Sequence, residues 1–178
     1  SSIGPFPGAS RSEVFETEYG PEQGVDLDAT IDELAWTAQP EYSDGEVHML
    51  PGGIAATYLV REIHSPDARR MGITLGSDDG IRVWLNGTEV LANDVPRAVA
   101  LDQDRLQLEL REGANQLLLK IANYGGGYGF AFRVEEEDFG GLPLNGVHAL
   151  GGERDDETAL VLRDYYRRTH SEDWRRLD

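Results

Sequence analysis

The stretch Met71–Leu91, MGITLGSDDGIRVWLNGTEVL, limits what this chain can fold into more than any other part of the sequence. Its apolar and polar residues alternate with a period of two, which is the pattern of strands that are buried on one face. Asn86-Gly87 favours a two-residue hairpin, because both central residues of a type I′ turn need a positive φ. Three strands with two tight turns, a β-meander, are therefore predicted here, with Trp84 facing away from the layer that contains Val83.

Much of the chain between residues 13 and 134 has the pattern of short strands separated by turns that contain Gly or Pro. Residues 54–63 and 106–110 alternate, and Gln116–Ala122 is apolar on both faces, as a central strand between two layers would be. Roughly nine or ten strands at a spacing of roughly 8 to 12 residues are typical of a sandwich. The predicted fold class is all-β: an antiparallel, jelly-roll-like β-sandwich over residues 13–134, with a C-terminal helical extension.

The segments on either side of this sandwich are predicted to differ from it. Residues 1–12 have the composition of an irregular lead-in, and residues 135–178 that of an acidic linker followed by a C-terminal helix. In that helix Asp155 can act as the N-cap, and basic residues near Thr169 complement the helix dipole. The sequence opens without a charged and apolar signal segment, so we expect a signal peptide that is absent or removed. The start at Ser1-Ser2, followed by GPFPG, suggests an excised piece of a longer protein.

Charge and hydropathy exclude two classes of partner. The formal net charge is −17, and residues 1–52 alone hold 11 acids and one base. Such a chain repels the phosphates of nucleic acid, and without a run of eighteen apolar residues it is not expected to insert into a membrane. The acidic segment is either a solvated surface or a source of oxygen ligands for calcium. The second interpretation would use Glu16, Glu18, Asp26, Asp28 or Asp32.

The motifs of common enzyme classes are absent from the sequence. No cysteine is present, which excludes disulfides, thiolate metal sites and cysteine nucleophiles. The four histidines have no metal-ligand spacing, no GxSxG occurs, and the glycines at 125–127 precede a strand rather than a helix. A glycosidase needs two carboxylates at a set separation, which a sequence does not give. A non-catalytic protein is predicted, with a glycoside hydrolase fragment as an alternative.

The SDDG and WLNG motifs, together with Glu112–Ile121, EGANQLLLKI, also carry a family resemblance. The chain resembles PA14 and galactose-binding-like β-sandwich domains over about residues 15–134, as found in large planctomycete proteins with cytochrome-c-like domains. In PA14 lectins paired aspartates hold a calcium ion that binds sugar hydroxyls, and Asp78 and Asp79 match that pair. The resemblance implies an accessory module of a larger exported bacterial protein, in the periplasm or on the cell surface, with calcium as cofactor and carbohydrate as partner.

Two sets of residues are the candidates for a site. Asp78 and Asp79 are adjacent carboxylates that a cation would stabilise, although an ordinary Asp-Asp-Gly turn explains them equally well. Aromatic rings stack on sugars and amides bond their hydroxyls, and both occur at loops and strand tips here. The predicted ligand-binding residues are Trp84, Asn86, Tyr124, Tyr128 and Tyr42, the three tyrosines being expected to be exposed. Each has a structural alternative: packing under a crossing loop for Trp84, the hairpin for Asn86 and loop anchoring for the tyrosines.

Two functions therefore remain open, and burial separates them. A calcium-assisted carbohydrate-binding module needs an open cluster of aromatic and carboxylate side chains. A structural or protein-interaction module, which would contact a neighbouring protein domain and bind no small ligand, predicts instead that Trp84, Asp78 and Asp79 are covered or already hydrogen-bonded.

Overall fold

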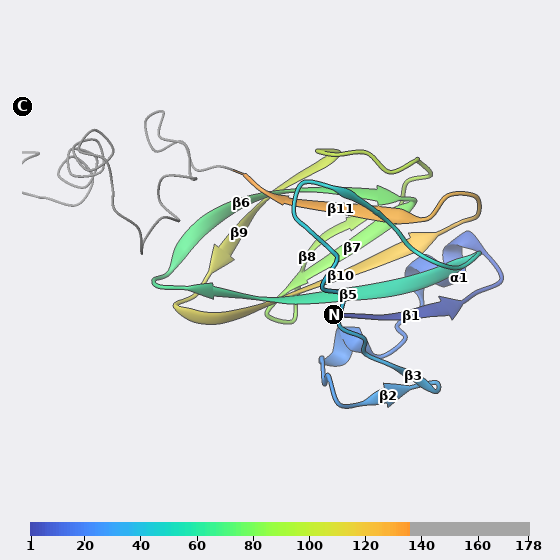
Figure 1. Cartoon of the computed structure of the whole chain (residues 1–178), viewed down its shortest axis with the longest axis horizontal. Coiled ribbons are helices and arrows are strands. Elements are labelled where there is room, and N and C mark those ends of the chain that lie inside the picture. Colours follow the sequence, from blue (N-terminus) through green and yellow to red (C-terminus); the bar gives the residue numbers. More distant parts are fainter. Residues whose placement is uncertain (136–178) are drawn as a thin grey trace, which may run out of the picture. The chain divides into compact units, whose positions relative to one another are not determined.

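Two antiparallel sheets face each other across an apolar core in the computed structural model, which describes residues 1–135 (Figure 1). The first sheet has five strands in the order β1 (Ser2–Pro7), β5 (Ala55–Ser65), β10 (Gly113–Asn123), β7 (Gly80–Leu85) and β8 (Thr88–Asn93). The second has four, in the order β4 (Val47–Met49), β11 (Gly129–Val134), β6 (Arg69–Asp78) and β9 (Asp104–Leu110). The predicted all-β sandwich is confirmed.

The main core lies between the two sheets and follows the alternation of the sequence. Leu117, Leu119 and Ile121 of β10 point into it, and Ile81 and Val83 of β7 pack beside them. β10 lies between β5 and β7, so its backbone is paired on both sides, as its apolar pattern predicted. The main core is therefore built from every second residue of the longest strands.

The stretch 71–91 forms the three predicted strands, but they are not one meander. β6 pairs with β9 and β11 in the second sheet, whereas β7 pairs with β8 and β10 in the first. The turn at Asp78-Asp79 therefore carries the chain from one sheet to the other, and its peptide bond is cis. The predicted hairpin between β7 and β8 is confirmed, with φ of 51° at Asn86 and 81° at Gly87.

The N-terminal region differs from the sequence-based expectation in two places. Residues 1–12 are not only an irregular lead-in, because Ser2–Pro7 forms strand β1 and pairs with β5. Residues 13–17, where the predicted sandwich begins, do not form a strand; they belong instead to the short helix α1 (Arg11–Glu16) and its C-cap. Ser10 caps that helix, its Oγ accepting a hydrogen bond from the N–H of Glu13 at 3.3 Å. A local cap thus overrides a weak strand pattern.

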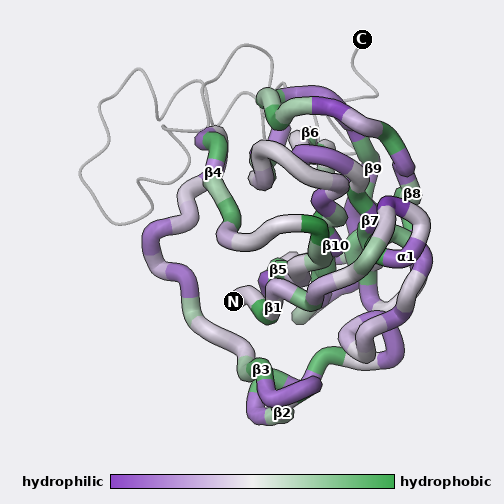
Figure 2. The backbone as a smooth tube through the Cα atoms, turned by 90° about the vertical axis from the view of Figure 1, so that its right-hand side faces the viewer, coloured by the Kyte–Doolittle hydropathy of each residue, from purple (hydrophilic) through white to green (hydrophobic). Residues whose placement is uncertain are grey.

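The segment after α1 crosses the outer face of the five-stranded sheet. It contains η1 (Pro21–Gln23) and a separate hairpin of β2 (Thr30–Ile31) and β3 (Leu34–Ala35). The connection from β3 to β4 then runs along the outside of the sandwich in mostly hydrophilic colours (Figure 2). Beneath this covering lies a second cluster made of Ile3, Phe6, Tyr58, Trp84 and Leu118, with Trp36 packed against it.

Lys120 holds this covering segment to the central strand. Its side chain is fully buried, and its Nζ donates to the carbonyl oxygens of Phe15 at 3.1 Å and Thr17 at 2.5 Å. Glu22 follows at 3.5 Å, and the hydroxyl of Tyr58 donates to the same carboxylate. Burial lowers the pKa of Lys120, and the nearby charge of Glu22 opposes that shift.

The predicted acidic linker and C-terminal helix lie outside the described residues. In the described part, no helix is long and apolar enough to cross a membrane.

Candidate functional site

The aspartate turn, Asp78-Asp79, lies against the glycine-rich loop that follows β10. One carboxylate oxygen of Asp79 accepts the N–H of Tyr124 at 2.8 Å, and the other accepts the N–H of Arg97 at 2.9 Å. Gly127 approaches Asp78 so closely that a Cβ there would lie 2.5 Å from Oδ2. The structure therefore brings three predicted site residues, Asp78, Asp79 and Tyr124, to one end of the sandwich.

The two aspartates at this end of the sandwich are buried and not open to solvent. Asp78 is 8% exposed and Asp79 is 7% exposed. Burial and the charge of Asp79 raise the pKa of Asp78, against the effect of the Val99 backbone N–H. The Tyr124 hydroxyl donates to the Asp94 carboxylate, and both burial and this bond raise the pKa of Tyr124.

A calcium ion at the aspartate turn would have hard oxygen donors, as it prefers, but few of them. Both oxygens of Asp79 already accept a backbone N–H, and calcium needs about six to eight oxygens. Within residues 1–135 no group of three or more His, Asp or Glu side chains is arranged to hold a metal. The two aspartates are of the chemical type that calcium binds. Because they are too few to complete its coordination, backbone carbonyls, water or ligand hydroxyls would have to supply the remaining ligands.

Three predicted ligand-binding residues lie away from the aspartate turn, and their side chains are already packed or hydrogen-bonded within the protein. Trp84 faces away from the main core as predicted, but it is only 6% exposed because it packs in the cluster beneath the N-terminal segment. Asn86 is at the β7–β8 hairpin, where its amide donates to Asn115 at 2.9 Å and accepts from Gln116 at 3.0 Å. The expectation that Tyr128 is exposed is wrong: it is 2% exposed, and its hydroxyl donates to the carbonyl of Ile121 at 3.0 Å.

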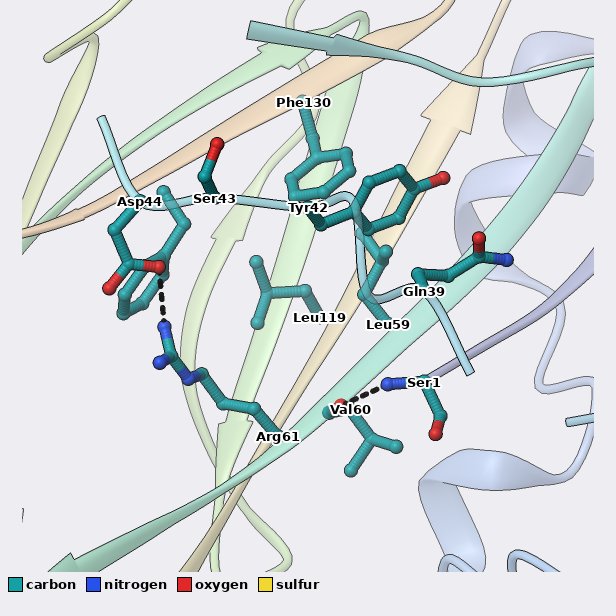
Figure 3. A pocket seen from close by; sticks show the side chains of 11 residues that line it. Ser1, Gln39, Tyr42, Ser43, Asp44, Leu59, Val60, Arg61, Leu119 and Phe130 are labelled. Atoms are coloured by element: carbon teal, nitrogen blue, oxygen red, sulfur yellow. Dashed lines mark hydrogen bonds and ion pairs between the residues drawn. The ribbon is translucent and has the colours of Figure 1, made fainter. Parts of the chain in front are cut away.

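Tyr42 lines an open pocket at one edge of the sandwich. Its lining comes mainly from β5 and β11, one strand of each sheet, and from the segment before β4. Leu59, Leu119 and Phe130 of the main core also lie in this lining. We call this cavity, of about 220 Å³, the edge pocket (Figure 3). Its lining comprises Ser1, Gln39, Tyr42, Ser43, Asp44, Leu59, Val60, Arg61, Leu119, Phe130 and Phe132.

The edge pocket combines an apolar floor with a polar rim. Leu59 and Leu119 lie at its base, and the rings of Tyr42 and Phe130 meet edge to face with centroids 5.1 Å apart (Figure 3). On the rim Arg61 Nη1 donates to Asp44 Oδ1 at 2.8 Å. Burial raises the pKa of Tyr42, with a smaller contribution from the charge of Glu41.

The outer wall of the pocket is the segment 38–46, which we call the strap. Gln39 Nε2 donates to Ser2 Oγ at 2.8 Å at one end, and the N–H of Gly45 donates to the carbonyl of Phe132 at 2.8 Å at the other. His48 supports the middle, because its ring lies 4.8 Å from that of Tyr42 and its Nε2 lies 3.1 Å from the backbone N of Ser43. Side-chain contacts therefore set the position of Tyr42.

Sequence reasoning identified Tyr42 but missed the ion pair beside it. Asp44 is two residues further on in the same turn, and Arg61 occupies a position on β5 whose alternation places it on the same face as Leu59. A charged residue at an inward position of a strand is a signal that a polar site opens there. Its partner could not be inferred, because Asp44 and Arg61 meet only through the arrangement of the strap.

Comparisons with known proteins give partial structural likenesses. Neither a family model nor a curated protein matches the sequence. The chain is similar to the PA14 domain of the MpAFP antifreeze protein, with a TM-score of 0.40 and 19% identity over 47% of this chain and 44% of that chain. It is also similar to a CBM35 from Paenibacillus barcinonensis, with a TM-score of 0.35 and 14% identity over 57% of this chain and 87% of that one.

A third likeness is to a β-glucosidase from Kluyveromyces marxianus, with a TM-score of 0.37 and 15% identity over 46% of this chain and 11% of that chain. The PA14 domain and the CBM35 are the kinds of β-sandwich that the sequence resembles.

Proposed function

We propose that this domain is a non-catalytic carbohydrate-binding module that holds one sugar unit in the edge pocket. The observation that supports it is the meeting of an aromatic ring, Tyr42, with the Asp44–Arg61 ion pair above an apolar floor. A sugar ring has C–H faces that pack on aromatic and aliphatic side chains, and hydroxyls that bond to charged groups. Both kinds of partner are present here within one cavity.

The size and charge of the pocket favour a single, neutral sugar ring as the ligand. Its volume of about 220 Å³ is below the range of about 300–1,000 Å³ that is typical of sites for drug-sized ligands, which favours a single ring. Asp44 and Arg61 neutralise each other, so a neutral sugar is favoured over a charged one. Asp44 is the one carboxylate among the described residues of the lining, whereas a glycosidase uses a pair. The lining thus supports binding without hydrolysis.

The test is titration of the protein with glucose, galactose, mannose and xylose, followed by NMR or calorimetry. Tyr42→Ala is expected to weaken binding of the best of these sugars about tenfold or more, since about 1.4 kcal/mol corresponds to a factor of ten. Tyr124→Ala, at the aspartate turn, is the matched control and should leave the affinity unchanged. Loss of binding in Tyr124→Ala but not in Tyr42→Ala would move the site to the aspartate turn.

Calcium at the aspartate turn forms a separate part of the proposal. Its support is the buried pair of carboxylates and the raised pKa of Asp78, since a bound cation would offset the repulsion between the pair. A ligand that binds only the native state raises the melting temperature by mass action. Thermal unfolding in EDTA and then in about millimolar calcium is therefore expected to show a rise that Asp78→Asn removes. No rise would reject calcium and leave the edge pocket unaffected.

The context of the module is proposed from the sequence resemblance alone. It is an extracytoplasmic module, periplasmic or on the cell surface, within a larger bacterial protein. Fractionation of the source cells with an antibody to this domain tests that placement, and recovery in the cytosol would contradict it.

A structural or interaction module is the second candidate. It is favoured by the burial of Trp84 and by the two backbone hydrogen bonds that Asp79 accepts. It becomes the leading candidate if none of the four sugars binds and calcium has no effect on the melting temperature.

A further inference from the structure

The Asp44–Arg61 ion pair lies at one end of the edge pocket. Arg61 belongs to β5 in the first sheet, and Asp44 belongs to the strap, which is bound to β11 in the second sheet through Gly45 (Figure 3). The ion pair therefore links the two sheets at that end of the pocket. The Arg61 guanidinium also lies 4.7 Å from the centre of the Phe132 ring, which holds it over that end of the floor.

The other end of the pocket is closed by backbone pairing. Ser1 and Val60 exchange two hydrogen bonds, of 3.0 Å and 2.8 Å, and Gln39 bonds to Ser2 beside them. A ligand in the pocket thus meets a barrier at each end. A single terminal ring fits between the barriers, whereas a chain running along the sheet edge would have to cross one of them.

We infer that the Asp44–Arg61 pair determines specificity, because it restricts the pocket to the terminal unit of a saccharide. This inference rests on the proposed function. The two side chains are 45% and 44% exposed, and exposed ion pairs contribute little to stability. Breaking the pair should therefore open that end of the pocket into a groove without unfolding the domain.

The experiment compares the affinity for the best-binding monosaccharide with that for its linear trisaccharide. In the wild-type protein the two affinities are expected to be about equal, because one ring is held in each case. In Asp44→Ala and in Arg61→Ala the trisaccharide is expected to bind about tenfold tighter than the monosaccharide, because further rings reach the opened end. The double variant Asp44→Arg/Arg61→Glu rebuilds the ion pair in reverse and should return the ratio to about one.

The double variant distinguishes the effect of the Asp44–Arg61 ion pair from the effect of direct contacts between these side chains and the sugar. If Asp44 and Arg61 act only as individual sugar ligands, each single variant lowers the affinity for the monosaccharide and for the trisaccharide by the same factor. The double variant with the reversed ion pair then also binds both weakly. That result would overturn the inference. The exposed pair Arg70–Glu109 on the second sheet is the matched control, and Arg70→Glu/Glu109→Arg should leave the ratio at one. If the wild-type protein binds no saccharide, the proposed function fails together with this inference. Binding with an unchanged ratio in the single variants overturns the inference alone.

Discussion

Asp78 is a residue whose surroundings oppose its ionisation. Burial and the charge of Asp79 raise its pKa above the ordinary value of 3.8, so the folded state holds its proton more tightly than the unfolded chain does. The stability that this contributes is fully present below about pH 3.8 and is lost as the pH rises through the folded-state value. At neutral pH the ionised Asp78 carboxylate therefore lowers the free energy of unfolding.

Asp78→Asn is accordingly expected to raise the melting temperature at pH 7 in EDTA. The side chain keeps its shape and its acceptor oxygen but loses the charge that opposes Asp79. Melting curves of both proteins between pH 3 and pH 8 provide the check, and the difference should disappear below about pH 3.8. A variant that is less stable at every pH would show that the Asp78 charge is compensated in the native state.

Lys120 illustrates the opposite case, a buried charge with its partners in place. Removing one partner of a buried pair leaves the other charge uncompensated, which typically costs about 3–5 kcal/mol. Lys120→Met is therefore expected to lower the free energy of unfolding by about that amount, measured in urea, because Glu22 would remain buried. The double variant Lys120→Met/Glu22→Gln should recover a large part of the loss. Equal destabilisation in both variants would mean that Lys120 acts mainly through the carbonyls of Phe15 and Thr17.

At the scale of elements, the loop 94–103 lies tightly on β6. The carbonyl oxygen of Ala100 lies only 1.9 Å from the position that a Cβ would take at Gly76. Hydrogen bonds on either side hold the loop there, from Gln103 N–H to the Leu75 carbonyl at 2.9 Å and from Thr74 Oγ1 to Asp102 at 2.6 Å. This loop also supplies the Arg97 N–H that binds Asp79.

Gly76→Ala is expected to destabilise the domain by about 1–3 kcal/mol, because the loop backbone must move to admit the methyl group. Gly53→Ala is the matched control, since no atom lies within 4 Å of its added Cβ. Urea unfolding of the two variants provides the comparison. If both variants have the same free energy of unfolding, the loop backbone moves to admit the methyl group without destabilising the domain.

At the scale of the whole molecule, the described residues contain both sheets of the sandwich. Residues 1–135 form a compact unit that includes the core between the two sheets. A protein that ends at Glu135 is therefore expected to unfold in one cooperative transition, with a melting temperature within a few degrees of that of the full chain. Calorimetry of both proteins tests this. A broad transition, or a loss of about 10 °C or more, would mean that the following residues stabilise the sandwich, since about 1 kcal/mol shifts the melting temperature of such a domain by roughly 2–8 °C.

Most strands were predictable because their signals are local. The alternation of Ile81, Val83 and Trp84 assigned their faces, and Asn86-Gly87 located the hairpin. The local signal failed where sequence neighbours do not become spatial neighbours. β6 and β7 are consecutive, yet they belong to different sheets, because pairing depends on partners such as β10 and β11 that lie far along the chain.

The sequence by itself determined the fold class, the faces of the main strands and the closeness of Asp78 to Asp79. Only the tertiary structure decided which candidate side chains are accessible. Trp84 and Tyr128 are covered because segments distant in sequence pack on them. Tyr42 and Arg61 line one pocket because the strap carries Asp44, two residues after Tyr42, to Arg61 of β5. The physical reason is that periodicity is a property of consecutive residues, whereas burial and pocket geometry depend on contacts between segments separated by many residues.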